Sequence, residues 1–252
     1  MLLNMNKISI VTVCYNSEKQ IENTILSVIS QSYPNIEYII EDGGSTDGTL
    51  DIIEKYRSKI SAIYSEKDKG VFDAMNKAVL RSTGEWILFM NAGDRFHDNN
   101  AIEKLFCAEI PKNVGAIHGD TFFVKECGIQ YIKCSPFYLV KGIRPMGICH
   151  QSILVRTALA KKYLFDMTFK YAADYNMMMR IYNDGFNFKY IPIAVSDYDL
   201  TGISSVHLTS QYKEVARICN ETSGLGYYMG LFHAWNREFR LRIKSIMGYK
   251  RV

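Results

Sequence analysis

The chain has 252 residues, of which 48% are hydrophobic and 22% charged, and its net charge is +4. These values are typical of a globular chain with enough apolar material for a core, and they exclude a disordered polar chain. So small a positive charge does not indicate a nucleic-acid-binding protein, and we expect no nucleic acid partner.

The first half of the chain alternates strand and helix patterns. Short β-branched or apolar runs predict strands, and apolar residues at helical spacing predict helices between them. Ser17 and Gln20 have the spacing of a capping box, and Asp47 is placed to cap the next helix. This alternation is typical of βαβ units and a parallel sheet. The predicted strands are 8–13, 36–40, 60–64 and 86–90, and the predicted helices begin near residues 17, 47 and 72.

The pattern loosens after residue 115, where strands and helices are more mixed. From Tyr228 onward, apolar residues recur at helical spacing with arginines and lysines between them, which predicts a basic amphipathic helix. Such a helix fits peripheral attachment to a membrane surface, packing on the domain, or contact with a second copy of the chain. The other predicted strands are 116–118, 121–124, 129–132 and 188–195, the predicted helices are 156–163 and 174–182, and a stretch rich in Pro and Gly covers 135–147.

The cysteines and the N-terminus bear on the location of the protein. The six cysteines show no C-x-x-C pair and no zinc-type spacing, so we expect free thiols in a reducing compartment. The first residues lack the order of a signal peptide, and no stretch has the roughly 18 apolar residues of a spanning helix. The sequence predicts a cytoplasmic protein, at the inner face of the cytoplasmic membrane if its C-terminal helix binds lipid.

One carboxylate follows the apolar strand predicted at 86–90. In the sequence Asn91-Ala92-Gly93-Asp94, Asp94 stands beyond the carboxyl end of that strand, where open α/β sheets bind ligands. A lone carboxylate can hold a divalent cation when the phosphates of a substrate supply the other oxygens. Asp94 is therefore a candidate ligand for Mg²⁺ or Mn²⁺.

Residues 41–49 join the second predicted strand to a helix and are rich in glycine and acids. They contain neither G-x-G-x-x-G nor G-K-[ST], which excludes the dinucleotide-binding and P-loop motifs. A tight turn and a ligand loop both explain the glycines and Asp47. Asp42, at the strand end, fits a ligand contact better.

Two other side chains are candidates for binding a nucleotide. Tyr15 ends the first predicted strand and can stack on a base, although a core tyrosine has the same pattern. Lys69 lies in a charged segment and can offset the charge of a diphosphate, although a solvated loop lysine fits as well.

Four segments, in this order, resemble those of the family 2 inverting glycosyltransferases, which have the A-type nucleotide-sugar fold. The resemblance covers residues 7–206, and it is strong because four weak motifs occur in order. The chain is similar in particular to bacterial enzymes that build capsular, exopolysaccharide, colanic-acid-type or lipopolysaccharide units. The segments are Thr12-Val13-Cys14-Tyr15-Asn16, Asp42-Gly43-Gly44-Ser45-Thr46-Asp47-Gly48-Thr49, Ser65-Glu66-Lys67-Asp68-Lys69-Gly70 with Asp73-Ala74-Met75-Asn76, and Phe89-Met90-Asn91-Ala92-Gly93-Asp94.

The resemblance implies a set of donor-binding residues, with Tyr15 and Asp42 at the base and with Asp68 or Lys69 beside the ribose and diphosphate. Asp94 matches the metal-binding carboxylate of the family. This chain departs from the usual D-x-D motif, having Asn91 and Gly93 where acids are common, so the cation should bind together with the donor. The donor-binding residues implied are Thr12, Tyr15, Asp42, Asp68, Lys69, Asn76 and Asn91.

The resemblance also implies an acceptor side. Tyr171-Ala172-Ala173-Asp174-Tyr175 looks like the acidic motif in which the aspartate matching Asp174 is the catalytic base; a helix cap is the alternative. His150, Gln151 and Tyr171 match positions near the acceptor, although His150 equally fits a buried structural role. Residues 201–207 resemble the loop that closes over the donor phosphates.

The expected fold is an α/β/α sandwich around a mainly parallel, mixed sheet with a Rossmann-like nucleotide-binding half. We expect a glycosyltransferase domain at 1–206, with a donor half at 1–95 and an acceptor half at 96–206, and a helical extension at 207–252. The expected reaction transfers a sugar, with inversion, from a nucleotide-diphosphate sugar such as a UDP-sugar to a hydroxyl of a lipid-linked saccharide. One base suffices, because the diphosphate leaving group needs no acid of the kind a glycosidase uses. The alternatives are a sugar-phosphate nucleotidyltransferase and a non-catalytic nucleotide-sugar-binding subunit.

Overall fold

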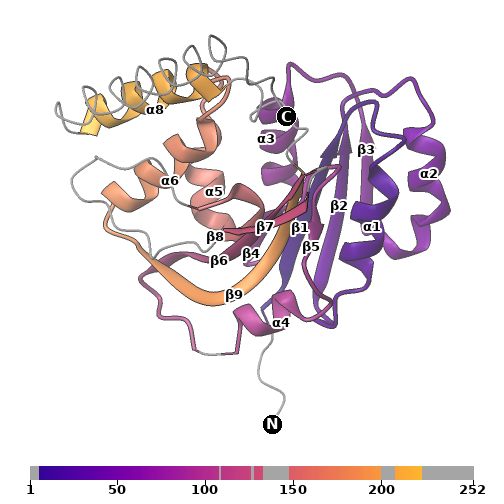
Figure 1. Cartoon of the computed structure of the whole chain (residues 1–252), viewed down its shortest axis with the longest axis horizontal. Helices are drawn as coiled ribbons and strands as arrows, with labels where there is room; N and C mark the ends of the chain where they lie inside the picture. The colour runs from indigo at the N-terminus through magenta and orange to yellow at the C-terminus, as the bar shows by residue number, and fades with distance from the viewer. Residues whose placement is uncertain (1–5, 108, 126–127, 133–147, 200–207, 223–252) are drawn as a thin grey trace.

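A computed structural model describes residues 6–107, 109–125, 128–132, 148–199 and 208–222 (Figure 1). Within these ranges, nine strands form one sheet in the order β3-β2-β1-β4-β8-β6-β9-β5, with β7 paired to β6. The strands are β1 (Ile8–Cys14), β2 (Ile36–Asp42), β3 (Ala62–Ser65), β4 (Trp86–Phe89), β5 (Arg95–Phe96), β6 (Val114–Lys125), β7 (Gly128–Ile132), β8 (Ile153–Arg156) and β9 (Asn187–Asp199).

The sheet is mixed. β3, β2, β1 and β4 are mutually parallel, whereas β8 runs antiparallel to both β4 and β6. The chain passes from β1 to β2 on one side and later returns to β4 on the other side of β1. Ligands bind at such a switch point, outside the carboxyl ends of the strands.

Helices cover both faces of the sheet (Figure 1). One core contains buried side chains of α3, α5, α6 and α8, and the other contains those of α1, α2 and α4. The helices are α1 (Ile21–Ile29), α2 (Thr49–Lys55), α3 (Val71–Arg81), α4 (Ala101–Leu105), α5 (Thr157–Tyr163), α6 (Ala173–Asn183) and α8 (Leu208–Thr222), with short 3₁₀ turns η1 (Arg57–Lys59) and η2 (His150–Ser152).

β1 lies in the middle of this arrangement and is buried along its whole length. Ile8 and Ile10 pack in the core beside α1, and Val11 and Val13 pack in the core beside α3. A strand buried on both faces needs mainly apolar residues, and the two polar residues of β1, Ser9 and Thr12, both have hydrogen-bond partners inside the protein.

The predicted alternation of strands and helices in the first half is confirmed, while several details differ. α1 begins at Ile21, not at Ser17, and its N-cap Gln20 makes no side-chain capping bond. The Ser17 carbonyl instead accepts the backbone N–H groups of Gln20 and Ile21, so the predicted capping box is wrong. The strands predicted at 116–118 and 121–124 are one strand, β6. The strands β5 and β8 and the helix α4 were not predicted, and α8 lies within the helical extension expected at 207–252.

Three predictions fall outside the described residues: the stretch 135–147, the closing loop at 201–207 and the basic helix from Tyr228. In the part of the chain that the structure describes, no helix combines the length and the apolar character needed to span a membrane.

A carboxylate joins the starts of β1 and β2 to the turn after α3. Glu37 has a side chain that is 10% exposed, and it accepts hydrogen bonds from Lys7 Nζ (2.7 Å), Ser9 Oγ (2.6 Å) and the Thr83 backbone N–H (2.8 Å). Burial alone would raise the pKa of Glu37, but these hydrogen bonds outweigh it and lower the pKa to about 2. A folded-state pKa below the ordinary value stabilises the fold above about pH 4.5, and the contribution is lost as the pH falls through the folded value.

Glu37→Gln should lower the free energy of unfolding by about 2 kcal/mol near neutral pH, because hydrogen bonds to a charged group are lost. Urea denaturation at about pH 7 and about pH 3 measures the difference in unfolding free energy between the two proteins. The difference should shrink at the lower pH, because Glu37 of the unfolded chain is protonated below its ordinary pKa of 4.5. The exposed Glu54 on α2 provides the matched control Glu54→Gln, with no expected change at either pH. An equal difference at both pH values would contradict the prediction.

Candidate functional site

The candidate site follows the carboxyl ends of the four parallel strands. Tyr15 comes directly after β1, Gly43 after β2 and Glu66 after β3. The Gly43 backbone N–H donates to the Cys14 carbonyl (2.9 Å), and the Ala92 N–H donates to the Val13 carbonyl (3.2 Å). These bonds extend the pairing of β1 with its neighbours past the strand ends, so the three following loops start side by side.

Tyr15, Gly43 and Asp68 lie together and suit the binding of a planar group. Tyr15 is 62% exposed, which excludes the alternative of a core tyrosine. A Cβ atom on Gly43 would stand 2.4 Å from Asp68 Oδ2 and 3.5 Å from Tyr15 Cδ2. Only a glycine leaves this space open between the tyrosine ring and the carboxylate.

Asp42 is buried, and its carboxylate holds the loop after β2. Oδ2 accepts the backbone N–H groups of Gly44 (3.1 Å) and Ser45 (3.0 Å) and the Ser65 hydroxyl (2.7 Å), and Oδ1 accepts the Ser45 hydroxyl. Gly44 has φ +84°, a backbone conformation that suits glycine. The structure thus gives Asp42 a role in shaping the loop, and the expected base contact stays a prediction.

Thr12 and Asn76 differ from the expectation of direct donor contact. The Thr12 hydroxyl is buried, donates to the Met90 carbonyl (2.8 Å) and pairs with the Tyr38 hydroxyl (3.0 Å). The Asn76 side chain accepts the Phe165 N–H (2.7 Å) and donates to the Phe165 carbonyl (2.9 Å). Both side chains have partners inside the protein, which gives them structural roles, and the expected donor contacts stay predictions.

Two further residues of the donor motifs lie in loops. Lys69 is exposed, and its backbone N–H donates to Asp73 Oδ2 (3.0 Å) at the start of α3. Asp47 accepts the backbone N–H groups of Thr49 (3.1 Å) and Glu18 (3.2 Å), which supports the interpretation of a structural turn.

A tight turn presents Asp94 after β4. The Asp94 N–H donates to the Asn91 carbonyl (3.0 Å), and Gly93 has φ +101°, which favours glycine at that position. Thr24 on α1 locks the turn, because its hydroxyl accepts the Gly93 N–H (3.1 Å) and donates to the Asp94 carbonyl (2.7 Å). Sequence reasoning missed Thr24, since nothing in the α1 sequence indicates a contact about 70 residues away.

The same turn suits a divalent cation in one respect. The amide oxygen Asn91 Oδ1 is buried without a hydrogen-bond partner among the described residues, beside the turn that carries the Asp94 carboxylate. Oxygen atoms of this kind are the preferred ligands of Mg²⁺ and Mn²⁺. Among the described residues, however, no three His, Cys, Asp or Glu side chains gather as a metal site. A cation here would need oxygen atoms from its substrate.

The 3₁₀ turn η2 lies between Asp94 and a second acid, Asp174. Gln151 donates its amide N–H to Asp94 Oδ2 (2.8 Å), and the Cys149 thiol donates to Gln151 Oε1 (3.0 Å). The preceding residue, His150, has its Nδ1 4.0 Å from Asp174 Oδ2. Consecutive side chains of one short turn therefore contact both acids. Gln151, predicted to contact an acceptor, uses its amide to hold Asp94.

Asp174 stands in the first turn of α6 with its side chain 19% exposed. Its Oδ1 accepts the adjacent Tyr175 N–H (2.8 Å), and the helix N-cap is Ala172, not Asp174. Burial raises the pKa of Asp174, and the nearby charge of Glu214 adds to the increase, while His150 opposes it. A carboxylate with a raised pKa is a better proton acceptor near neutral pH.

His150 is enclosed by aromatic rings. Its ring stacks on Phe89 at 5.3 Å and meets Phe165 edge-on at 5.9 Å, and the side chain is 11% exposed. Both ring nitrogens are buried without a hydrogen-bond partner among the described residues. Burial lowers the pKa of His150, although the Asp174 carboxylate opposes this. A neutral imidazole with unused nitrogens differs from a fully bonded structural histidine.

The remaining predicted acceptor residue, Tyr171, is half-buried in the segment before α6. Its backbone N–H donates to Glu214 Oε2 (2.8 Å) on α8. Sequence reasoning did not single out Glu214. The predicted closing loop at 201–207 lies outside the described residues.

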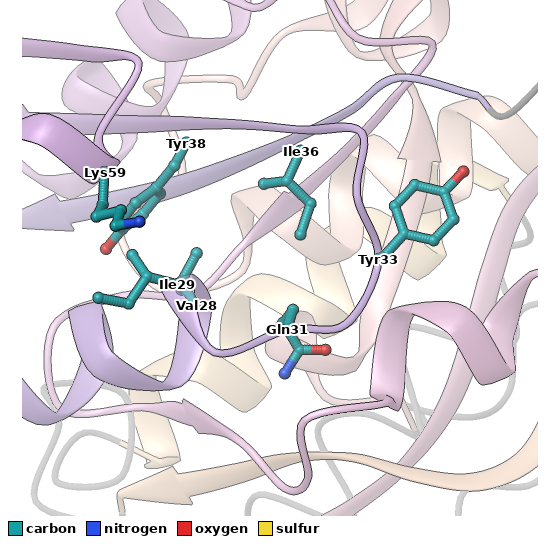
Figure 2. Close-up of a pocket in the computed structure, with 7 residues that line it drawn as sticks. All are labelled: Val28, Ile29, Gln31, Tyr33, Ile36, Tyr38 and Lys59. Atoms are coloured by element: carbon teal, nitrogen blue, oxygen red, sulfur yellow. The ribbon is translucent and has the colours of Figure 1, made fainter.

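A cavity of about 130 Å³ lies elsewhere, near the start of β2 (Figure 2). This volume is below the roughly 300 Å³ at which ligand pockets begin. The lining includes Val28 and Ile29 of α1, together with Ile36, the first residue of β2, whereas the candidate site follows the opposite ends of the strands. We therefore exclude this cavity as a nucleotide site.

Comparison with known proteins finds glycosyltransferases both among family descriptions and among individual relatives. The family description "Glycosyl transferase family 2" matches residues 9–168. The putative teichuronic acid biosynthesis glycosyltransferase TuaG of Bacillus subtilis is 37% identical over 101 residues, which are 39% of this chain and 40% of TuaG. A PGL/p-HBAD biosynthesis glycosyltransferase of Mycobacterium bovis is 26% identical over 194 residues, 74% of each chain.

Among solved structures, S. aureus TarS 1-349 in complex with UDP matches with a TM-score of 0.65 and 22% identity. The match covers 86% of this chain and 65% of the TarS chain. It confirms the predicted A-type fold with its mixed sheet. The matched regions are 40% of TuaG and 65% of that TarS chain, less than two thirds of either protein.

The contact between His150 and Asp174 predicts a measurable coupling. Because the Asp174 carboxylate raises the pKa of His150, Asp174→Asn should lower the pKa of His150 further below its ordinary value. NMR titration of the histidine ring nitrogens measures this. Asp184→Asn, at the other end of α6, is the matched control, and a His150 pKa that is the same in all three proteins would disprove the coupling.

Proposed function

This chain belongs to glycosyl transferase family 2, and from that premise we propose that it transfers a sugar from a nucleotide-diphosphate donor to a saccharide acceptor. We propose further that the donor is a UDP-sugar, that the acceptor is a hydroxyl of a lipid-linked saccharide, and that the product belongs to a bacterial surface polysaccharide. The names of TuaG and of the mycobacterial relative, and the UDP bound to TarS, support these choices.

One observation carries the proposal: consecutive residues of η2 contact a strand-end acid and a buried helix acid. Gln151 holds Asp94, and His150 stands beside Asp174. An inverting transfer needs a site for the diphosphate on one side of the reacting carbon and a base on the other. The two acids suit these two tasks.

On the donor side, Tyr15 and Asp68 would bind the nucleoside, since the tyrosine face is exposed and the carboxylate lies beside it. Lys69 would offset phosphate charge. Asp94 and the amide oxygen of Asn91 would hold Mg²⁺ or Mn²⁺. When bound, such a cation supplies charge stabilisation for the leaving diphosphate.

On the acceptor side, Asp174 would act as general base. The acceptor hydroxyl gives its proton to the Asp174 carboxylate while its oxygen forms a bond to the anomeric carbon. The bond from that carbon to the diphosphate oxygen breaks, and the electron pair leaves with the nucleotide. Because attack comes from the face opposite the leaving group, the anomeric configuration inverts.

The division into a donor half at 1–95, an acceptor half at 96–206 and an extension at 207–252 follows the same proposal. Peripheral membrane attachment remains a prediction for the basic helix from Tyr228, which lies outside the described residues.

The donor side is tested by Asp94→Ala. UDP release from UDP-sugars in the presence of Mn²⁺ should fall by more than roughly 100-fold, because charge stabilisation by a cation is worth several kcal/mol. Asp51→Ala, an exposed acid in the first turn of α2, is the control and should retain full activity. Unchanged UDP release from Asp94→Ala would remove Asp94 from the proposal.

The base is tested by Asp174→Asn, which keeps the shape of the side chain but not its basicity. Sugar transfer to glycolipid acceptors should fall by roughly 100- to 10,000-fold, the range of general-base contributions, while calorimetry should show unchanged UDP affinity. A variant that transfers sugar at the wild-type rate would refute the assignment. Tight binding of UDP-sugars by the wild-type chain without transfer to any glycolipid would instead favour a non-catalytic binding subunit.

A further inference from the structure

The helix α8 packs against the segment that carries Asp174 (Figure 1). Its buried residues Val215 and Ile218 belong to the core shared with α6. The Arg217 guanidinium stands 4.3 Å from the centre of the Phe169 ring, and the Tyr175 hydroxyl lies 3.4 Å from Cys219 Sγ. Contacts from α8 therefore reach residues on both sides of Asp174.

Glu214 makes the closest of these contacts. Its Oε1 accepts the Lys170 N–H (2.8 Å), and its Oε2 accepts the N–H groups of Tyr171 (2.8 Å) and Ala172 (2.9 Å). Three successive backbone N–H groups that converge on one point form an anion-binding concavity. A carboxylate from another helix fills it here.

The sequence before α6 cannot supply this anion itself. The N-cap residue is Ala172, which has no side-chain oxygen, and no side-chain capping bond forms there. Residues 170–172 lead directly into the first turn of α6, which carries Asp174. The position of their amides therefore determines the position of the Asp174 backbone and of its carboxylate. Hydrogen bonds to a charged acceptor are stronger than those to a neutral one, so Glu214 restrains this segment through three strong bonds.

We propose that Glu214 is a positioning residue for the catalytic base: it fixes the three amides before α6, and through them the placement of the Asp174 carboxylate. The proposal rests on the function proposed above for Asp174. It makes α8 part of the active-site framework, although α8 lies beyond the residues 9–168 that match the family description.

The charge of Glu214 affects the pKa of Asp174, so the proposed role can be measured by titration. Burial has the largest effect on the pKa of Asp174 and raises it. Among the described residues, two titratable groups also act on this pKa: His150 from η2 lowers it, and Glu214 from α8 raises it. Removing the Glu214 charge should therefore lower the pKa of Asp174. A residue that only stabilised the fold through packing would not shift this titration.

The experiment compares Glu214→Gln and Glu214→Asp with the wild-type chain. In Glu214→Gln, ¹³C NMR of aspartate carboxyls, with Asp174→Asn identifying the signal, should show a lower Asp174 pKa, and amides 170–172 should exchange faster with D₂O. The kcat for UDP release from UDP-GlcNAc should fall roughly 10- to 100-fold, as expected for a misplaced catalytic group, and the acid limb of its pH profile should move to lower pH. The affinity for UDP should stay unchanged.

Glu214→Asp keeps the charge, so it should retain the raised Asp174 pKa and more of the activity than Glu214→Gln, and it serves as the test if the glutamine variant does not fold. The exposed Glu54→Gln is the control for loss of a glutamate. An Asp174 pKa and amide exchange that are the same in wild type and Glu214→Gln would overturn the proposal, as would an Asp174 pKa in Glu214→Asp as low as that of an exposed aspartate. Absence of UDP release from the wild-type chain would count against the proposed function alone, because the NMR readout needs no turnover.

Discussion

The hydrogen bond from Gln151 to Asp94 is the contact on which the arrangement of the site depends, because it fixes η2 between the two acids. Hydrogen bonds to the sheet also hold η2 in place. The Ser152 hydroxyl pairs with the Ser196 hydroxyl of β9 (2.6 Å) and donates to the Asp120 carbonyl of β6. With its position fixed on the sheet, η2 can present only one residue to each acid. Two consecutive residues therefore set the separation between the donor side and the acceptor side. Asp94 cannot shift without breaking its buried hydrogen bond to Gln151, which costs about 1–3 kcal/mol.

The carboxylates of Asp42, Glu214 and Asp174 differ in the number of hydrogen bonds that they accept. Asp42 and Glu214 each accept three or more hydrogen bonds from backbone and hydroxyl groups, which makes them fixed parts of the framework. Asp174 has one neighbouring backbone donor and a raised pKa, so its proton affinity remains available for chemistry. The number of donors, more than the degree of burial, distinguishes an acid that shapes the protein from an acid that accepts a proton.

Several residues of the site could be predicted because their signals are local. Asp94 stands five residues after the end of β4, and Tyr15 follows β1 directly. Thr12 and Asn76 differ in this respect, and their donor contacts stay predictions. Their motifs suggested ligand contact, but their hydrogen-bond partners lie 78 and 89 positions away along the chain, at Met90 and Phe165. No spacing rule covers such separations, and the same limit hid Thr24.

The sequence by itself determined the alternation of strands and helices in the first half, the acids that follow its strands, and the resemblance to a glycosyltransferase family. Those features depend on periodicity and on neighbours along the chain, which sterics and backbone hydrogen bonding control locally. Only the tertiary structure decided that η2 touches both acids and that Glu214 of α8 supplies the anion before α6. The physical reason is that a buried polar group takes whichever partner the folded chain brings within about 3 Å of it, and that choice depends on the path of the whole chain.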